Sequence, residues 1–321
     1  MSIKRIAVLT SGGDAPGMNA AIRAVTRKAL YHNLEVIGIH RGYQGLITED
    51  FSPMNVSSVA AIINKGGTAL KTARCEQFKN QEGFSKAVQF VRKCNIDAIA
   101  VIGGDGSMTG AQKLSEAGIP TVVIPATIDN DMPGTEYALG FDTALNTILE
   151  AVNKIRDTSL SHDRVAIIEV MGRHAGQLAL YAGISCGAEH ILIPEIPVEI
   201  DNVCRGLVRS KERGKMFSII MVAEGAGRGY EIAAQIAERI PLSSNVTILG
   251  HIQRGGNPTA KDNIIASCMG AAAVDSIVAG HYNCLISQQQ GNIITLPYEE
   301  AFKMKREIDK NIYLMAGILA Q

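Results

Sequence analysis

The stretch PATIDND places two carboxylates around an amide directly after an apolar run of the chain. Residues 121–124 are apolar or β-branched, and Thr127, Asp129 and Asp131 follow them. In an extended segment, residues two apart point the same way, so these three side chains would share one face. We predict that Asp129 is the base for a substrate hydroxyl, that Asp131 is a metal-side or orienting carboxylate, and that Thr127 binds a phosphate or sugar. The alternative is an Asx-type turn with solvated carboxylates.

Two glycine-rich turns follow other apolar runs and could hold phosphate groups. Gly12–Gly13 follows residues 5–10, and Gly104–Gly106 follows residues 98–102. Glycine lets backbone N–H groups approach phosphate oxygens next to a helix N-terminus. Each turn alone could be only a tight connection, but two of them favour phosphate binding. Neither turn is a Walker A motif. The first apolar run is not followed by a GxGxxG pattern, so the fingerprint of a dinucleotide-binding site is absent.

Asp105 lies between the glycines of the second turn and predicts a magnesium site. A carboxylate beside a polyphosphate holds Mg²⁺ directly or through water. The alternative is that Asp105 caps a helix that begins near Ser107.

Cationic side chains recur beside the apolar runs and glycine turns. Planar guanidinium groups bind phosphate through two hydrogen bonds. The strongest candidates are Arg173 in MGRHAG and Arg254 in HIQRGG. Each alone could be an ordinary surface arginine, but their recurrence favours an anion site. The other members of this group are Arg74, Arg164 and His251.

Two further cation pairs lie elsewhere in the chain. Arg23 and Arg27 are one helical turn apart, so they share a face, and Arg213 and Lys215 form a second close pair. Taken alone, a solvated helix face and a solvated loop are the favoured interpretation.

Short apolar runs alternate with glycine-rich or polar turns and helical patterns along the chain. Runs that are apolar on both faces and alternate with helices predict buried parallel strands in an α/β fold. In such folds ligands bind outside the carboxyl ends of the strands, where most of the residues above are expected. The runs are residues 5–10, 98–102, 121–124, 165–170, 218–223 and 246–249.

Composition indicates a globular protein with no formal net charge. The chain has 321 residues, 46% of them hydrophobic, with 31 Lys plus Arg and 31 Asp plus Glu. A zero formal charge argues against a nucleic-acid surface or a polybasic membrane surface. None of the six cysteines forms a CxxC pair, and no apolar stretch approaches the length of a membrane span. We therefore expect reduced thiols in a cytoplasmic protein.

A series of longer motifs resembles one enzyme family, the bacterial ATP-dependent 6-phosphofructokinases. The resemblance runs from the first apolar run to about residue 275 and is weak beyond it. The combination of TIDND, GGDGS and MGR in this order is highly specific. The motifs are TSGGDAPGMNAAIR, INKGGT, TARC, VIGGDGS, TIDNDMPGT, FDTALNT, KIRDTSLSHDR, EVMGRHAG, VAEG and LGHIQRGGNPT.

The resemblance implies transfer of the ATP γ-phosphoryl group to the 1-hydroxyl of fructose 6-phosphate with Mg²⁺, a step of glycolysis. It implies that Asp129 is the base, and that Thr127, Asp131 and Arg173 assist it. The positions that match the ATP and Mg²⁺ site are Gly13, Arg74, Cys75, Gly104, Asp105, Gly106 and Ser107. The positions that match the sugar-phosphate site are Thr127, Ile128, Asp129, Met171, Gly172, Arg173, Glu224, His251 and Arg254, with Arg164 from a neighbouring subunit.

The resemblance also implies an architecture: a homotetramer whose subunits have two doubly wound lobes with mainly parallel sheets. Residues 1–140 with 253–304 would form the nucleotide-binding lobe, and 141–252 with 305–321 the sugar-phosphate lobe. An effector site lies between subunits in this family, where ADP activates and phosphoenolpyruvate inhibits. Its matching positions are Arg23, Arg27, Arg156, Gly187, Glu189, Arg213 and Lys215.

Two departures from the family pattern carry predictions. Asn245 stands where relatives usually carry an arginine that reaches the 6-phosphate of an adjacent subunit, so we predict weaker binding of fructose 6-phosphate. Val56, Met216 and Phe217 stand where some relatives carry effector-site cations, so we predict weak effector control.

Two small residues, Gly106 and Ala126, predict which phosphoryl donor the protein uses. Pyrophosphate-dependent relatives carry Asp at the position of Gly106 and Lys at that of Ala126. Gly106 and Ala126 leave room for a nucleotide, so ATP is the predicted donor, although Ala126 departs from the family's usual glycine. The alternatives are a pyrophosphate-dependent enzyme and a non-catalytic phosphometabolite sensor on the same fold. The missing dinucleotide fingerprint disfavours a dehydrogenase.

Overall fold

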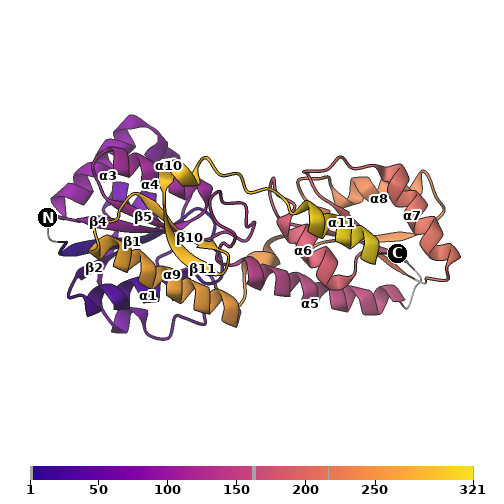
Figure 1. Cartoon of the computed structure of the whole chain (residues 1–321), viewed down its shortest axis with the longest axis horizontal. Helices are drawn as coiled ribbons and strands as arrows, with labels where there is room; N and C mark the ends of the chain where they lie inside the picture. The colour runs from indigo at the N-terminus through magenta and orange to yellow at the C-terminus, as the bar shows by residue number, and fades with distance from the viewer. Residues whose placement is uncertain (1–2, 161–163, 216, 321) are drawn as a thin grey trace. The chain divides into compact units, whose positions relative to one another are not determined.

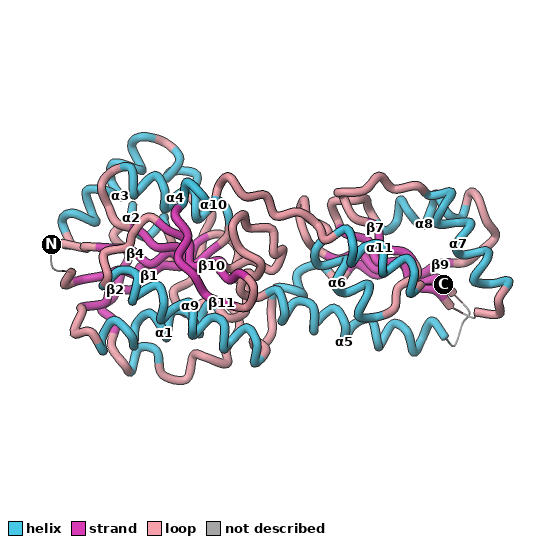
Figure 2. Tube along the Cα trace, viewed as in Figure 1, coloured by secondary structure: helices cyan, strands magenta, loops and turns pink. Residues whose placement is uncertain are grey.

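The structure is a computed structural model of the chain and describes residues 3–160, 164–215 and 217–320. The chain divides into two compact units (Figure 1). The first consists of Met1–Thr143 and Arg254–Arg306, and the second of Ala144–Gln253 and Glu307–Gln321. Each unit has its own sheet with helices around it, as Figure 2 shows in magenta and cyan. The assignment of nucleotide and sugar phosphate to separate lobes stays a prediction.

A seven-stranded sheet forms the centre of the first unit, in the order β11-β10-β5-β4-β1-β2-β3. The strands between the two edges run parallel, and β3 and β11 pair antiparallel at the edges. The strands are β1 (Arg5–Ser11), β2 (Glu35–Ile39), β3 (Phe51–Met54), β4 (Ala98–Gly103), β5 (Thr121–Pro125), β10 (Cys284–Gln289) and β11 (Asn292–Pro297).

Helices cover both faces of this sheet, which explains why its central strands are mainly apolar. In β1, Ile6 to Leu9 are completely buried. Ala7 and Leu9 pack in one cluster with Phe90 and Leu114 of α3 and α4, while α1 and α9 pack together on the other face (Figure 1). The helices are α1 (Met18–Tyr31), α2 (Tyr43–Thr48), α3 (Gln81–Lys93), α4 (Asp105–Glu116), α9 (Ala260–Val278) and α10 (Tyr298–Ala301).

A four-stranded parallel sheet, in the order β7-β8-β6-β9, forms the centre of the second unit. Ile167 and Ile220 pack against α7 and α8 on one face, and α6 packs against the sheet and against α11. The elements are α5 (Phe141–Leu160), β6 (Val165–Val170), α6 (Gln177–Cys186), β7 (His190–Leu192), α7 (Ile200–Glu212), β8 (Ser218–Ala223), α8 (Gly229–Ala237), β9 (Ser244–Ile248) and α11 (Lys310–Leu319).

The predicted fold class, α/β with two doubly wound lobes and mainly parallel sheets, is confirmed. Both sheets follow from the alternation of apolar runs with helical segments, since parallel strands need helical crossovers. No described helix combines the length and the apolar character that crossing a bilayer requires.

Candidate active site

The two glycine turns lie side by side at the carboxyl ends of the first unit's parallel strands. β1 and β4 are parallel neighbours, and Ser11 pairs with Gly103, so Gly12–Gly13 and Gly104–Gly106 emerge side by side. Gly12 has φ 87°, a left-handed conformation that glycine adopts without strain. The Oγ of buried Ser107 would lie 3.4 Å from a Cβ on Gly12, so the second turn packs directly against the first.

The second turn is open toward solvent at the start of α4. Gly104 is the N-cap and Asp105 the first helical residue, so the alternative that Asp105 caps this helix is wrong. Asp105 and Gly106 are exposed, and a Cβ on Gly106 would meet no atom of the described residues within 4 Å. The N–H of Gly106 donates to the Asp105 carboxylate at 2.6 Å. A phosphate group can approach this helix N-terminus from solvent, and the helix dipole favours negative charge there.

Asp105 fits a Mg²⁺ ion that is also bound by substrate phosphates. Within residues 3–160, 164–215 and 217–320, no three His, Cys, Asp or Glu side chains are grouped as a metal site. Mg²⁺ commonly binds through one or two carboxylates, substrate phosphates and waters. Asp105, exposed at the helix start, suits that mode.

The loop that carries Thr127 and Asp129 follows β5, the strand next to β4, at the same carboxyl end of the sheet. The N–H of Ala126 donates to the carbonyl of Gly103 at 3.0 Å, and a Cβ on Gly104 would lie 3.7 Å from the Cβ of Thr127. The strand ends of β1, β4 and β5 therefore bring the two glycine turns and the predicted base into one region of the first unit.

The local conformation of this loop differs from the extended segment that we predicted. The Oγ of Thr127 accepts from the N–H of Asp129 at 3.2 Å, and Asn130 has φ 50°, so the chain turns between the two carboxylates. A single shared face for Thr127, Asp129 and Asp131 is therefore wrong. The alternative of an Asx-type turn with solvated carboxylates is right only in that the chain turns, because the acceptor is the Thr127 hydroxyl and both carboxylates are half-buried.

Segment 72–75 lies along the first glycine turn. The Oγ of Thr72 donates to the carbonyl of Gly12 at 2.8 Å, and the thiol of Cys75 donates to Gln44 at 3.2 Å. Arg74 between them is exposed. Thr72 thus places the start of this segment beside Gly12, whereas Cys75 contacts Gln44 of α2.

Arg254, predicted to bind the sugar phosphate, also lies against the first glycine turn. Its Nη2 donates to the carbonyl of Asp14 at 3.0 Å, and its Nε lies 3.4 Å from the Asp14 carboxylate. A Cβ on Gly13 would overlap this guanidinium group. The absence of a side chain at Gly13 therefore leaves room for Arg254, a packing reason that sequence reasoning missed.

A second group of predicted sugar-phosphate residues gathers at the carboxyl ends of β6 and β8 in the second unit. Val170 pairs with Ala223, and the N–H of Arg173 donates to the Glu224 carboxylate at 2.9 Å. The N–H of Met171 donates to Gln253 at 3.1 Å, and Gln253 donates to the carbonyl of Gly250 at 2.9 Å. Fully buried Gln253 thus connects the turn Met171–Gly172–Arg173 to the 3₁₀ helix η3 (Gly250–Arg254), which carries exposed His251.

Arg164 and Asn245 lie at the opposite end of this sheet. Arg164 precedes β6 rather than following an apolar run, and its Nη1 donates to the Asn245 carboxamide at 3.4 Å. β6 has six residues, which at about 3.3 Å each separate its two ends by about 20 Å. Within one chain the structure therefore does not bring Arg164 and Asn245 together with Arg173.

Several predicted effector residues come together in the second unit. Arg156 donates to the carbonyl of Cys186 and lies 6.0 Å from the ring centre of Phe217. Lys215 pairs with buried Glu189, which also accepts from the N–H of Ile219 at 2.5 Å. Gly187 ends α6 with φ 66°, and Arg213 ends α7. Arg23 and Arg27 lie on α1 of the first unit, with exposed Val56 also in that unit, and Met216 lies outside the described residues.

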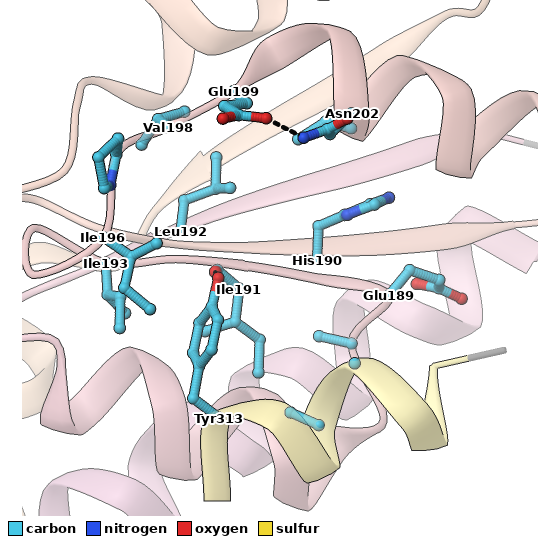
Figure 3. Close-up of a pocket in the computed structure, with 15 residues that line it drawn as sticks. Glu189, His190, Ile191, Leu192, Ile193, Ile196, Val198, Glu199, Asn202 and Tyr313 are labelled. Carbon is cyan, nitrogen blue, oxygen red and sulfur yellow. Dashed lines mark hydrogen bonds between the residues drawn. The ribbon is translucent and has the colours of Figure 1, made fainter. Parts of the chain in front are cut away.

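A cavity of about 410 Å³ adjoins this effector cluster (Figure 3). Its walls are β7, the loop that follows it, the start of α7, and Tyr313 of α11, whose hydroxyl donates to the carbonyl of Ile191 at 3.4 Å. His190 lines the cavity, and burial lowers the pKa of its imidazole, against the opposing effect of the Glu189 carboxylate. Its ring packs on α7, where a Cβ on Gly206 would lie 2.5 Å from it.

The lowered pKa of His190 predicts a loss of stability in mild acid. Below the ordinary pKa of 6.5, the unfolded chain binds a proton that the folded chain resists, so the free energy of unfolding falls as the pH drops toward the folded pKa. We expect His190→Gln to lose less stability than the wild type between pH 7.5 and 5.5 in denaturant titrations. The matched control is His174→Gln, since His174 is exposed. Equal losses in all three proteins would contradict this assignment.

The chain is similar to known proteins over its full length. The family model described as Phosphofructokinase matches residues 5–277. The chain is 52% identical over 318 residues to the ATP-dependent 6-phosphofructokinases of Halalkalibacterium halodurans and Clostridioides difficile, covering 99% of this chain and 100% of each relative. Among solved structures, phosphofructokinase from Saccharomyces cerevisiae matches 99% of this chain with a TM-score of 0.88 and 35% identity. The chain spans about half, 48%, of that yeast chain.

These matches agree with the sequence motifs and with the arrangement of turns at the strand ends. The family model covers most of the chain, and the bacterial relatives align with it from end to end. The chain therefore belongs to the phosphofructokinase family.

Proposed function

We propose that this protein transfers the γ-phosphoryl group of ATP to the 1-hydroxyl of fructose 6-phosphate, giving fructose 1,6-bisphosphate and ADP. The observation that carries the proposal is the convergence of three strand ends in the first unit. β1 and β4 supply the two glycine turns, and β5 supplies the loop with Asp129. The similarity to relatives named ATP-dependent 6-phosphofructokinase supports the same reaction.

In the proposed reaction, the backbone at Gly12–Gly13 and Gly104–Gly106 holds the phosphates of ATP. The Asp129 carboxylate accepts the proton of the sugar 1-hydroxyl as its oxygen bonds to the γ-phosphorus, and the bond from that phosphorus to the ADP oxygen breaks. Arg254, already beside Gly13, neutralises phosphate charge. Asp105 would hold Mg²⁺, which when bound supplies further charge neutralisation at the phosphates.

The free space at Gly106 favours ATP over pyrophosphate as the donor. A side chain there would occupy the open approach to the start of α4, as expected for relatives that do not accommodate a nucleotide. Separate reactions with ATP and with pyrophosphate, across a wide range of fructose 6-phosphate, test the proposal. We expect fructose 1,6-bisphosphate with ATP alone. Product with pyrophosphate would favour the second enzyme class, and no product with either donor would favour a sensor.

The position of Arg164 and Asn245 suits a role in a neighbouring subunit of a homotetramer. Both side chains are exposed, and they lie at the end of β6 away from Arg173, so they suit the site of another copy better than their own.

The effector cluster around Glu189 and Lys215 belongs to the same proposal. Phosphoenolpyruvate and ADP are the proposed effectors, and their influence is expected to be weak, because Phe217 and Val56 bring no charge.

Asn245→Arg is expected to strengthen binding of fructose 6-phosphate. The new guanidinium would stand beside Arg164 and could bind the 6-phosphate, and a charged hydrogen bond contributes about 1.5–3 kcal/mol. The half-saturation concentration should therefore fall about 10- to 100-fold. Steady-state kinetics would measure it, with Asn292→Arg as the control, an equivalent change at an exposed position of β11. An unchanged half-saturation in Asn245→Arg would contradict the proposed role of this position.

A further inference from the structure

We propose that Asn130 is a positioning residue for Asp129, and that Asp262 fixes the segment to which Asn130 is bonded. The inference rests on the proposed role of Asp129 as the base and deepens it. It explains why an amide separates the two carboxylates of the PATIDND stretch.

The backbone of Asn130 sets the direction of the loop. Its φ of 50° lies in the left-handed region, which asparagine adopts more readily than most other residues with a side chain. Together with the bond from the N–H of Asp129 to Thr127, this conformation turns the chain directly after Asp129. Asn130 itself is only 3% exposed.

The side chain of Asn130 bonds this loop to a segment that returns beside it. Its Oδ1 accepts from the N–H of Ala138 at 2.8 Å, and its Nδ2 donates to the carbonyl of Glu136 at 3.2 Å. The same segment bonds to the end of β5, because the N–H of Leu139 donates to the carbonyl of Pro125 at 2.9 Å. The loop is therefore closed at its base by backbone bonds and at its tip by the Asn130 amide.

A buried carboxylate in turn fixes the returning segment. Asp262 lies in the first turn of α9 and is completely buried. One oxygen accepts from the Tyr137 hydroxyl at 2.7 Å and the Gly140 N–H at 2.9 Å, and the other accepts from the Thr143 N–H at 2.9 Å and its hydroxyl at 2.5 Å. Four donors satisfy a group that would be costly to bury without partners.

These bonds form a continuous connection from α9 to the predicted base. Asp262 holds the segment around Tyr137 and Gly140, that segment holds Asn130, and Asn130 adjoins Asp129 along the chain. A base must lie within hydrogen-bond reach of the proton that it accepts, and a misplacement of about 1 Å can cost about 100-fold in rate. Asn130 contributes to catalysis through this geometry, without contacting the reacting atoms.

The first test is Asn130→Gly, which keeps the left-handed backbone and removes both side-chain bonds. We expect kcat to fall about 10- to 100-fold, with both KM values changed by less than about threefold. The matched control is Asn95→Gly, since Asn95 is exposed and has the same φ of 50° in the same unit. Its kcat should stay at the wild-type value. Melting temperatures of the two variants show whether the folded state is equally stable.

A double-mutant cycle separates positioning from general destabilisation. In an Asp129→Ser background, Asn130→Gly should change the residual kcat by less than about twofold, because the base that it positions is gone. Tyr137→Phe, which removes one donor to Asp262 and keeps the ring, should lower kcat severalfold in the wild type and leave it unchanged in Asp129→Ser. It keeps the inference testable if Asn130→Gly does not fold.

The outcomes distinguish this inference from the proposed function. A wild-type protein that forms no fructose 1,6-bisphosphate would overturn the proposed function. An active wild type with equal kcat in Asn130→Gly and Asn95→Gly would overturn only the positioning role. Equal losses from Asn130→Gly with and without Asp129 would also overturn it, since a purely structural role gives that result.

Discussion

Asp129→Ser is expected to lower kcat by about two to four orders of magnitude, the usual contribution of a general base. Asp129 is half-buried on a loop whose backbone is bonded to the ends of β4 and β5, so serine should fit without disturbing the fold. Both KM values should change only a fewfold, because the carboxylate acts mainly in the transition state. Steady-state kinetics with ATP and fructose 6-phosphate would measure these values.

Asp201→Ser is the matched control for that result. Asp201 is an exposed residue of α7 that forms a surface ion pair with Arg239 at 2.9 Å, and such pairs contribute little to stability. Its loss should leave kcat unchanged. If Asp129→Ser retained more than about a tenth of the wild-type kcat, the assignment of Asp129 as the base would be wrong.

Gly106→Asp is expected to lower kcat/KM for ATP by about 100-fold or more, because like charges brought together cost several kcal/mol. The folded state should tolerate the change. A Cβ at Gly106 meets no atom of the described part of the chain within 4 Å, and an acidic residue in the first turn of α4 is favourable to the helix dipole. The loss would therefore report on the space and charge that the phosphates require.

Two controls separate the contributions to this effect. Gly106→Ala tests size without charge and should cost less than the aspartate. Gly317→Asp makes the same change on α11 at another exposed glycine, where a Cβ would also meet no described atom within 4 Å. It should leave kcat/KM for ATP unchanged. ATP kinetics of Gly106→Asp within a fewfold of the wild type would contradict the proposed phosphate site.

The sequence predicted β1, β4, β5, β6, β8 and β9 because their signals are local, and it missed the parallel strands β2, β7 and β10. Each of the predicted runs is followed by a turn, and β-strands with both faces covered are mainly apolar, as Ile6 to Leu9 of β1 and Ala98 to Ile102 of β4 are. Chemistry at strand ends could be predicted for the same reason. Glycine turns and polar residues follow the runs directly in the chain.

The sequence did not reveal contacts made across long separations. Asp262 reads as part of a helix start, because Thr259 caps α9, and nothing local indicates that its carboxylate bonds to residues more than 100 positions earlier. A turn in the PATIDND stretch was only the alternative prediction, because the two carboxylates suggested an extended segment. Asparagine between them was itself the signal for a left-handed residue.

The placement of Arg164 shows a different limit. Strand direction decides at which end of a sheet a residue lies, and Arg164 precedes its run whereas Arg173 follows it. If both are interpreted as cations that follow a strand, they are expected to lie together, but β6 separates Arg164 from Arg173. The bond from Arg164 to Asn245 shows instead that Arg164 lies beside the start of β9.

The most direct test of the central claim follows the transferred group itself. ATP labelled with ¹⁸O in its γ-phosphoryl group would be incubated with fructose 6-phosphate and Mg²⁺, and the position of the label would be read by ³¹P NMR. We expect the label in the 1-phosphate of fructose 1,6-bisphosphate, none in the 6-phosphate, and almost none in any product of Asp129→Ser. Unlabelled sugar phosphate with the wild-type protein, or equal labelling by Asp129→Ser, would contradict the account.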